Sequence, residues 1–558
     1  MITDETKEHI RKELLLNALK NGGKMNPGTI LGVMLSQNAE LKKDIISLRS
    51  AISEVAEEYK EKSFNEIQEL AKKYEVKIEE KKKERKGMVE LEVSGNYRGR
   101  IPPEPSKHLH VGHALSFIIN YIYAQKYNGS VVLRFEDTNP DLSKQEYVDS
   151  IKDDILNYLK IKPDEISFAS DNMQLFYNKS KELLQNNDAY ICTCTKEDIS
   201  EGRMKMEECK CRSRSADNSL LMLDSMITGK TEQGKAVLRL KGDMKSKNAV
   251  MRDPILLRIS KTEHYKYGNK YSAWPVYYLE NSIMDGKEKV THILRSNEFG
   301  KMHEELQEFL KKKLGYALPR VYQYGRFNIK DAETKGREIR AGIEKGEYMG
   351  WDDPRLATLK TMKRRGIKAE TFYEIAREMG LSANQTTVDW KMIEKYNRRF
   401  VDKTAKRYSF IFDPISIEVN NYSEKQVALK HHPDDEIAER ILSTNGKFLI
   451  RKEDVQDYFR LMDAGNVKKE SDNYTLESET IDEFRKSGGK NIINWLPNDE
   501  SQLAEATIVM PNATELKGKV EKKILKSEVG DVVQLERFGF CSIDNIKDNS
   551  ITLWFGHK

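Results

Sequence analysis

Residues 100–113, RIPPEPSKHLHVGH, join a short extended segment (97–101) to an apolar run of helical character (114–124). Prolines stiffen the loop between the two. His110 and His113 lie three positions apart, so they share one face of the first helical turn. Gly112 lets the backbone approach a ligand closely, so the imidazole N–H groups and the free amides of the helix start suit a polyphosphate such as ATP. Alone, the pattern also fits a helix cap or half of a metal site.

A second extended segment follows this helix. Residues 130–135, SVVLRF, are predicted to form a buried parallel strand. Strand, loop, helix and strand make a βαβ unit. Glu136 and Asp137 come directly after the second strand, at the edge where open α/β sheets bind ligands. The sequence therefore predicts a nucleotide-binding α/β domain.

Length and charge set the outer limits. The 558 residues suffice for about three or four domains. The net charge is only +5, so attraction to nucleic acid must come from local basic clusters, found at 81–86, 363–365 and 398–399. The N-terminus lacks a signal-peptide pattern, and no apolar stretch approaches the roughly 18 to 20 residues of a membrane helix. We therefore expect a cytoplasmic protein without a membrane partner.

Four of the five cysteines form two Cys-x-Cys pairs separated by fourteen residues. Thiolates at Cys192, Cys194, Cys209 and Cys211 can close a tetrahedral structural zinc site. The loop 195–208 is long enough to fold back and too charged to bury itself unaided. Reduced surface thiols or a redox pair are the alternatives, and neither explains two pairs that face each other across one loop. We therefore predict a structural Zn²⁺.

Residues 100–113, together with LRFEDTNP at 133–140, resemble the signature segments of class I glutamyl- and glutaminyl-tRNA synthetases. The Pro-Pro-Glu-Pro loop is similar to that of the archaeal and eukaryotic branch. The resemblance covers essentially the whole chain and is strongest from Arg100 to Arg355. It implies an aminoacyl-tRNA ligase with a Rossmann-like α/β catalytic domain.

The resemblance also implies an order of domains. Short alternating apolar runs such as 408–412 and 551–555 indicate strands, which favours the β-barrel anticodon domain of this branch over the helices that end bacterial glutamyl enzymes. The expected domains are a helical N-terminal extension (1–88), a Rossmann catalytic domain (89–330) with an inserted α/β zinc-knuckle and acceptor-end domain (about 190–285), a lysine-loop and helical stem-contact region (331–399), and C-terminal anticodon-binding β-barrels (400–558).

The same resemblance implies the substrate pocket. Arg295 ends a strand-like run at 290–295, where glutaminyl enzymes place a small neutral residue, usually cysteine. Arginine offers a bidentate fork to a carboxylate and no comparable benefit to a neutral amide, so glutamate is the expected substrate. Arg100 is the second pocket cation, and Glu136 would accept from the substrate ammonium. The full set implied for substrate binding is Arg100, Glu104, Ser106, Glu136, Tyr277 and Arg295. An ordinary salt bridge is the alternative for each arginine.

The lysine loop departs from the family. Relatives carry a Lys-Met-Ser-Lys-Ser-like motif before Gly-Trp-Asp-Asp-Pro-Arg, which is intact here at 350–355. A gapless match places Glu338 where the catalytic lysine belongs. An acid cannot stabilise a developing pyrophosphate charge, so Lys335 or Arg337 is expected to supply the cation. We favour Lys335, because Gly336 beside it gives the loop freedom to move.

The implied reaction joins glutamate to tRNA through an adenylate. The glutamate carboxylate attacks the α-phosphorus of ATP, with Mg²⁺ on the phosphates, and the terminal adenosine of tRNA then attacks the mixed anhydride. Rate would come from positioning and charge stabilisation. The expected ATP-binding residues are His110, Gly112, His113 and Lys335. The expected catalytic residues are His110, His113, Lys335 and Arg337.

The expected partner is tRNA(Glu), the protein is expected to be a monomer, and charging of tRNA(Gln) stays open. Three alternatives remain: a glutaminyl-tRNA synthetase, which Arg295 disfavours; a class I nucleotidyltransferase with a small acceptor, which needs neither a zinc insertion nor a barrel domain; and a zinc-containing RNA-binding protein whose catalytic fold has decayed. Only the unusual lysine loop supports the last.

Overall fold

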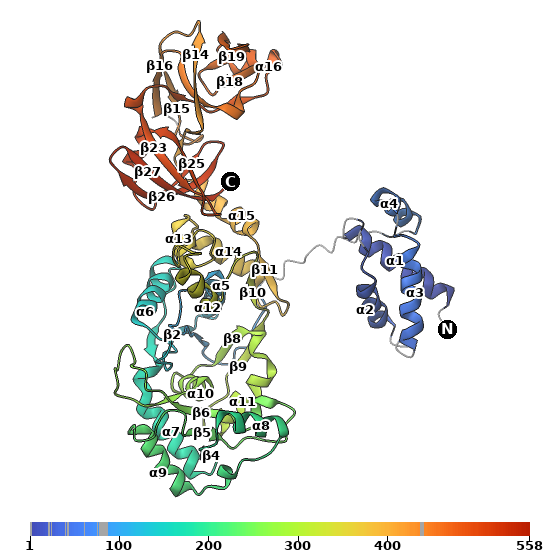
Figure 1. The fold of residues 1–558 in the computed structure, drawn as a ribbon, viewed down its shortest axis with the longest axis vertical. Helices are drawn as coiled ribbons and strands as arrows, with labels where there is room; N and C mark the ends of the chain where they lie inside the picture. Colours follow the sequence, from blue (N-terminus) through green and yellow to red (C-terminus); the bar gives the residue numbers. More distant parts are fainter. Residues whose placement is uncertain are drawn as a thin grey trace. The chain divides into compact units, whose positions relative to one another are not determined.

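The computed structural model describes residues 3–20, 23, 25–38, 41, 44–60, 62–74, 76, 88–435 and 440–558 (Figure 1). The chain divides into two units, Met1–Arg85 and Lys86–Lys558. The basic run 81–86 lies outside the described residues. None of the helices in the described ranges combines the length and the apolar character that a membrane crossing requires.

The N-terminal unit is helical, as predicted. Leu48, Ile52 and Val55 are buried and pack with Ile10 of the first helix, whereas Ile45, at the start of its helix, is exposed. The buried face of this helix thus begins after Ile45. The helices are α1 (Asp4–Lys20), α2 (Pro27–Gln37), α3 (Ile45–Glu57) and α4 (Phe64–Lys73).

The larger unit is built on a parallel sheet. Strands β1 (Arg98–Ile101), β2 (Ser130–Phe135) and β3 (Glu165–Phe168) pair in the order β1-β2-β3, and Arg100 lies opposite Val132. A second parallel pair joins β8 (His292–Ser296) to β9 (Arg320–Tyr324). The Thr291 amide donates to the Arg98 carbonyl (2.9 Å), so β8 lies beside β1. The predicted βαβ unit is confirmed.

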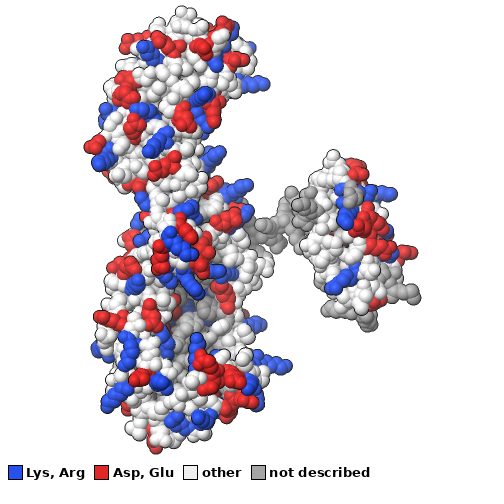
Figure 2. Space-filling view, viewed as in Figure 1, with Lys and Arg blue, Asp and Glu red and all other residues white. Residues whose placement is uncertain are grey.

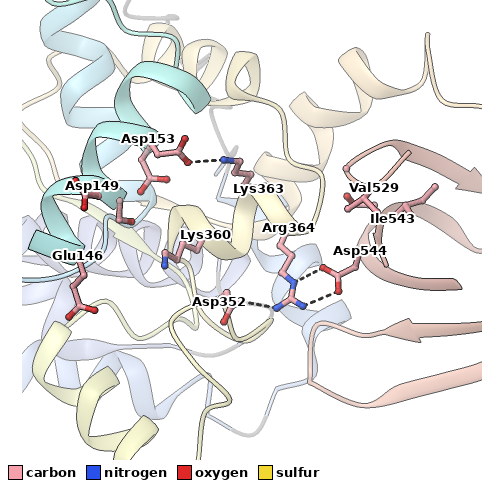
Figure 3. Close-up of a pocket in the computed structure, with 14 residues that line it drawn as sticks. Glu146, Asp149, Asp153, Asp352, Lys360, Lys363, Arg364, Val529, Ile543 and Asp544 are labelled. Atoms are coloured by element: carbon pink, nitrogen blue, oxygen red, sulfur yellow. Dashed lines mark hydrogen bonds and ion pairs between the residues drawn. The ribbon is translucent and has the colours of Figure 1, made fainter. Parts of the chain in front are cut away.

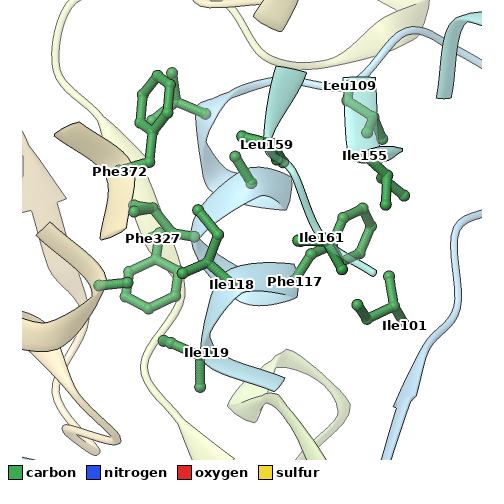
Figure 4. Packing of buried hydrophobic residues seen from close by; sticks show 14 of the residues in the cluster. Ile101, Leu109, Phe117, Ile118, Ile119, Ile155, Leu159, Ile161, Phe327 and Phe372 are labelled. Atoms are coloured by element: carbon green, nitrogen blue, oxygen red, sulfur yellow. The ribbon is translucent and has the colours of Figure 1, made fainter. Parts of the chain in front are cut away.

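Helix α5 (Val111–Lys126) crosses this sheet. Figure 4 shows its side chains Phe117, Ile118 and Ile119 among Ile161 and Phe327, within one continuous apolar cluster. Burial of this face holds the start of α5 at the carboxyl ends of the strands. After β2 the chain continues through α6 (Gln145–Lys152) into the π-helical turn η2 (Asp153–Tyr158).

An antiparallel sheet and its helices are inserted between β3 and β8. The four strands run in the order β4-β5-β6-β7, around a core that contains Trp274 and Leu238. Strand β7 leads directly into α10, which returns the chain to the parallel sheet. The elements are α7 (Met173–Gln185), β4 (Ala189–Cys192), α8 (Lys196–Lys205), η4 (Lys210–Ser213), α9 (Ala216–Ile227), β5 (Val237–Leu240), β6 (Ile255–Ile259), β7 (Ala273–Pro275), α10 (Tyr277–Lys287) and, after β8, α11 (Gly300–Lys313).

The region after β9 is mainly helical. It differs from the expected helical region in one respect: Thr386–Val388 forms strand β11, parallel to β10 (Phe327–Ile329). β-Branched Thr386, Thr387 and Val388 suit a strand better than a helix, which explains the difference. The helices are α12 (Gly336–Glu344), α13 (Leu359–Arg364), α14 (Ala369–Met379) and α15 (Trp390–Val401).

The C-terminal part is β-rich, with two seven-stranded sheets of largely antiparallel strands among the described residues. Their orders are β12-β25-β26-β27-β23-β24-β13 and β21-β18-β19-β20-β14-β17-β22. The run predicted at 408–412 falls in strands β12 and β13, and the run at 551–555 is part of β27, so the barrel-like prediction is confirmed. The elements are β12 (Arg407–Tyr408), β13 (Phe410–Phe412), β14 (Pro414–Asn420), β15 (Lys425–Leu429), β16 (Arg440–Thr444), β17 (Lys447–Arg451), β18 (Tyr458–Leu461), β19 (Gly465–Glu470), β20 (Asn473–Ser478), α16 (Ile481–Lys486), β21 (Ile492–Ile493), β22 (Leu496–Pro497), β23 (Leu503–Val509), β24 (Glu515–Glu521), β25 (Val532–Leu535), β26 (Gly539–Lys547) and β27 (Ser550–His557).

Charges of both signs are interspersed over the viewed face of the larger unit (Figure 2). Neither sign of charge dominates that face, as expected for a chain whose cations nearly balance its anions.

Candidate active site and metal centre

A cavity of about 470 Å³ lies at the carboxyl ends of β1, β2 and β8. This is the edge where open α/β sheets bind ligands. Its lining brings together seven of the predicted site residues: Arg100, Glu104, Ser106, His113, Glu136, Tyr277 and Arg295.

The two histidines cap the helix that they begin. His110 is the N-cap of α5, and its Nδ1 accepts from the Gly112 amide (3.1 Å). The Nδ1 of His113 accepts from the His110 amide (3.2 Å), and the two rings lie 3.8 Å apart, centroid to centroid. Because each Nδ1 is an acceptor, each neutral ring carries its proton on Nε2. The helix-cap alternative is therefore realised, and each ring keeps an Nε2–H donor for a ligand.

Both imidazoles are neutral at pH 7. Desolvation, followed by the positive charges of Lys107 and Arg326, lowers the pKa of His113 to about 3. Burial, followed by the neighbouring His113, lowers the pKa of His110 well below its usual range. These side chains can therefore meet a phosphate as hydrogen-bond donors but not as cations.

Gly112 is required by the fold of the cap itself. A Cβ at this position would lie 2.9 Å from Cε1 of His110 and 3.2 Å from the Phe327 carbonyl oxygen. The histidine segment is also anchored to the approach to α13, because the Val111 amide donates to the Ala357 carbonyl (3.0 Å).

A buried carboxylate organises the floor of the pocket. Asp285 on α10 accepts from Arg100 Nε (3.0 Å), Arg134 Nη2 (2.9 Å) and Lys311 Nζ (2.8 Å). All four side chains are nearly inaccessible to solvent. Burial alone would raise the pKa of Asp285, but Lys311, Arg100 and Arg134 outweigh it and hold the pKa well below its usual range. Asp285 therefore stays ionised and fixes the Arg100 guanidinium.

Glu136 and Arg295 are linked through two neutral amides. Glu136 Oε1 accepts from Asn281 Nδ2 (2.9 Å), and Asn281 Oδ1 accepts from Gln307 Nε2 (3.4 Å). Gln307 Oε1 in turn accepts from Arg295 Nη1 (2.6 Å). Desolvation raises the pKa of Glu136 against the opposing effects of Arg134 and Arg100. The residues expected at opposite ends of an amino-acid substrate are thus held in one hydrogen-bonded chain.

Sequence reasoning did not identify Asn281, Asp285 or Gln307. A signal was present for two of them, since Tyr277, Asn281 and Asp285 recur every four residues and share one face of α10. Gln307 lies on α11, a separate helix, and no local pattern marks it.

The lysine loop lies outside the cavity lining. Lys335 is the N-cap of α12, and its side chain is exposed, as are those of Arg337 and Glu338. The loop contacts the histidine side of the cavity through Arg340, whose Nη1 donates to the Ser106 carbonyl (2.9 Å). The roles of Lys335 and Arg337 stay predictions.

The four paired cysteines converge. The sulfurs of Cys192 and Cys209 are 3.7 Å apart, those of Cys194 and Cys211 are 3.9 Å apart, and all four ligand atoms lie within 4.8 Å of one another. Zn–S bonds of about 2.3 Å in a tetrahedron place sulfurs roughly 3.8 Å apart, so the cluster fits Zn²⁺.

Two arginines compensate the charge that such a cluster would carry. Arg239 Nη1 donates to the sulfurs of Cys192 (3.8 Å) and Cys209 (3.7 Å), and Arg214 Nη2 donates to Cys211 (3.7 Å). Four thiolates around Zn²⁺ carry a net charge of −2, which these donors offset.

A second cavity of about 600 Å³ lies between α6, α13 and β26 (Figure 3). It is lined by ion pairs, including Lys363 with Asp153 (2.8 Å) and Arg364 with Asp544 (2.6 Å). None of the predicted site residues lines it. This second cavity lies where the helical region meets the barrel. The smaller cavity, at the carboxyl ends of the strands, is therefore the candidate active site.

A parallel α/β sheet whose first crossover helix begins with His-x-Gly-His over a ligand cavity, followed by β-rich C-terminal domains, defines a class I aminoacyl-tRNA synthetase. Family models match residues 96–403 as the catalytic domain of class I tRNA synthetases (E and Q), and residues 405–485 and 492–544 as their anti-codon binding domains. The chain belongs to this glutamate and glutamine family.

Curated relatives match along their full length. The chain is 34% identical over 564 residues to the glutamate–tRNA ligase of Methanobrevibacter smithii, covering 100% of both chains. It is 36% identical over 552 residues to that of Methanothermobacter thermautotrophicus, covering 98% of each, and 33% identical over 571 residues to that of Pyrococcus furiosus, covering 98% of this chain and 99% of the relative.

Among solved structures, the glutamate-tRNA synthetase of Elizabethkingia anophelis matches with a TM-score of 0.41 and 16% identity, over 56% of this chain and 71% of that chain. The family assignment rests on the sequence comparisons, which span the whole chain.

Proposed function

We propose that this protein is a glutamate–tRNA ligase, which activates glutamate with ATP and transfers it to the 3′ end of tRNA(Glu). The observation that carries the proposal is Arg295 at the end of β8, lining the cavity with a guanidinium that Gln307 orients. An arginine in this position favours a carboxylate side chain over an amide. Full-length similarity to curated glutamate–tRNA ligases supports the same conclusion.

Within this function, the pocket residues divide between the two ends of glutamate. Arg100 and Arg295 each bind a carboxylate, and Glu136 accepts from the ammonium group. Tyr277 closes the side of the cavity beside Arg295. Glu104 and Ser106 line the cavity from the loop between β1 and α5. Buried, pre-oriented partners of this kind cost little reorganisation on binding.

The phosphates of ATP meet the start of α5. His110 and His113 would donate to the phosphates from Nε2, and Lys335 would reach the phosphates when the lysine loop moves. Mg²⁺, when bound, would supply further charge stabilisation. Positioning and charge stabilisation account for the rate, so no covalent enzyme intermediate forms.

Charging assays with purified tRNAs test the proposal. Labelled glutamate should be attached to tRNA(Glu), and ATP–pyrophosphate exchange should require glutamate and proceed in the presence of tRNA. Glutamine-dependent charging in place of glutamate would indicate the glutaminyl alternative. Absence of all exchange would favour the RNA-binding alternative, and exchange without any need for tRNA would favour the small-acceptor enzyme. The same assay with tRNA(Gln) decides whether this second tRNA is also charged.

We also propose that Cys192, Cys194, Cys209 and Cys211 hold one structural Zn²⁺. The sulfur spacing and the arginines around it support this. Metal analysis of the purified protein should find one zinc per chain, and Cys209→Ser should lose it. Buried Cys541, which lies far along the chain in the barrel core, provides the matched control, since Cys541→Ser should keep the metal. Equal zinc content in the two variants would contradict the proposal.

Finally, we propose that the inserted segment (about 190–285) binds the tRNA acceptor end, that residues 331–399 contact the stem, and that residues 400–558 bind the anticodon. The family descriptions of residues 405–485 and 492–544 as anti-codon binding domains support the last role. We further propose a monomer that acts in the cytoplasm, where charged tRNA is used in translation. Gel filtration with light scattering tests the monomer.

A further inference from the structure

Lys107 lies in the loop between β1 and α5 and lines the candidate active-site cavity. Its side chain is half-buried. Among the residues that the structure describes, its ammonium group has neither a hydrogen-bond acceptor nor an ion-pair partner. Glu104 and Glu298 act on this ammonium through space, without a direct contact, so the partly buried cation still favours binding of an anionic ligand.

The neighbours of Lys107 are those expected of a phosphate site. The loop delivers it to the histidine side of the cavity, and its charge contributes to lowering the pKa of both His110 and His113, so the ammonium lies close to both rings. Lys107 and the neutral N–H donor His113 therefore line the same cavity at the start of α5, and His110 lies against His113.

Lys107 also lies against the lysine loop. A Cβ on Gly336, the first residue of α12, would be 2.8 Å from Cδ of Lys107. Arg340 of the same helix bonds to the carbonyl of Ser106. The stem of Lys107 is thus held between the two segments that flank the phosphate side of the cavity, which limits the positions that its ammonium can take.

The other cations that line the cavity are already bonded to protein groups. The basic residues in its lining are Arg100, Lys107 and Arg295. Arg100 is bonded to Asp285 and Arg295 to Gln307, both on the amino-acid side. Lys335 and Arg337 are exposed and outside the lining. Lys107 is therefore the cavity cation available to the phosphates within the described part of the chain.

We propose that Lys107 is a catalytic residue that binds the ATP phosphates and stabilises the charge on the departing pyrophosphate, in the role that Glu338 of the lysine loop cannot perform. This inference rests on the proposed ligase function. In the step concerned, a glutamate carboxylate oxygen forms a bond to the α-phosphorus. The bond from that phosphorus to the oxygen bridging to the β-phosphorus breaks, and its electron pair leaves with pyrophosphate. Lys107 forms no covalent bond and transfers no proton.

The electrostatics agree with this role. Burial lowers the pKa of Lys107 against the opposing charge of Glu104; Arg326 and Arg340 also lower the pKa, and Glu298 opposes them. A bound polyphosphate would reverse that shift, because a nearby negative charge favours the ammonium form. The ligand and the charged side chain therefore stabilise each other.

The test compares Lys107→Met, which keeps the apolar stem but removes the charge, with Lys107→Arg, which keeps the charge. The matched control is Lys126→Met, an exposed lysine at the far end of α5. Glutamate- and tRNA-dependent pyrophosphate exchange is measured at varied ATP and varied glutamate. Lys107→Met should lower kcat/KM for ATP roughly a hundred- to a thousand-fold with the KM for glutamate little changed, by analogy with removal of one transition-state donor. Lys107→Arg should retain most activity, and Lys126→Met should behave as wild type.

A second measurement uses the unmodified protein. ATP with Mg²⁺ should protect Lys107, but not Lys126, from acetylation, as read by mass spectrometry. Lys107→Met within about twofold of wild type, or equal acetylation of Lys107 with and without ATP, would overturn the inference while leaving the ligase function standing. Loss of exchange in the wild-type protein itself would instead overturn the proposed function and this inference together.

Discussion

The amino-acid pocket and the lysine loop border the same catalytic cavity but are built in opposite ways. In the pocket, Asp285 binds three cations, and every partner is buried. In the loop, Lys335, Arg337 and Glu338 are exposed at the start of a short helix. The groups that select the amino acid are therefore fixed before it binds, whereas the loop that completes the phosphate side must move to act.

The largest effect should follow from breaking the pocket at its centre. Asp285→Asn leaves Arg100, Arg134 and Lys311 without their shared anion in a buried site. Removing one partner of a buried charge cluster costs about 3–5 kcal/mol. Chemical denaturation should show this loss of unfolding free energy, together with loss of glutamate activation.

The matched control for this variant is Asp153→Asn, because Asp153 forms a half-exposed pair with Lys363. Exposed pairs contribute about 0–1 kcal/mol. An equal loss of unfolding free energy in the two variants would show that the buried Asp285 cluster contributes no more to stability than an exposed ion pair.

Replacing Arg295 tests specificity rather than stability. Arg295→Gln removes the cation that faces the substrate carboxylate, and losing one partner of a desolvated charge pair costs about 2–5 kcal/mol in binding. We expect kcat/KM for glutamate to fall on the order of a hundred- to a thousand-fold, with the KM for ATP nearly unchanged. Arg377→Gln, at an exposed arginine paired with Glu374, should leave both constants at wild-type values. An unchanged KM for glutamate in Arg295→Gln would show that Arg295 does not bind the substrate carboxylate.

The neutral histidines give the phosphate side a pH signature. In the unfolded chain His113 has a pKa near 6.5, whereas folding lowers its pKa to about 3. Between these values the unfolded state binds the extra proton, so stability falls as pH drops below about 6.5. At pH 5 His113 alone should cost roughly 1–2 kcal/mol relative to pH 7.5. Unfolding of wild type and His113→Gln should therefore differ in pH dependence by this amount, and parallel curves would contradict a neutral, desolvated His113.

Gln307 offers a finer change within the pocket. A carboxylate in Gln307→Glu would lie where the amide oxygen now accepts from Arg295 at 2.6 Å, and it would compete with the substrate carboxylate for the same guanidinium. We expect the KM for glutamate to rise about tenfold and inhibition by glutamine to strengthen. Gln307→Met, which loosens Arg295 without adding charge, should raise the KM less. Equal KM values for the Glu variant and wild type would show that Gln307 does not position Arg295.

Sequence patterns predicted the features that depend on interactions between residues close together in the chain. The strand–loop–helix–strand unit at 97–135 follows from proline, helix-face and β-branched signals within forty residues. The four cysteines were identifiable because ligand spacing in the sequence reflects the closed loop that a metal needs. Tyr277, Asn281 and Asp285 were within reach of the same reasoning, because they share one helix face.

The rest depends on contacts between distant segments. Gln307 meets Asn281 and Arg295 only because α11 packs beside α10 and β8, and no spacing in the chain encodes that contact. Strand β11 was missed because three β-branched residues in a helical region are too short a signal without their partner β10. The sequence predicted no role for Lys107, because its proposed role depends on the cavity that it lines rather than on its neighbours in sequence.

The smallest effects should arise in the lysine loop. Lys335→Ala is expected to slow pyrophosphate exchange roughly tenfold and Arg337→Ala about twofold, because Gly336 lets Lys335 swing toward the phosphates whereas Arg337 is fixed one residue inside α12. Both side chains are exposed, so unfolding free energies should stay within about 0.5 kcal/mol of wild type. Pyrophosphate exchange, measured after rapid mixing with ATP, glutamate and tRNA, reports the activation step separately from tRNA charging. Equal, near-normal rates in the two variants would remove the loop from the activation step. The phosphate side would then rely on Lys107, whose stem packs against Gly336, and the lysine loop would not be needed to complete that side of the cavity.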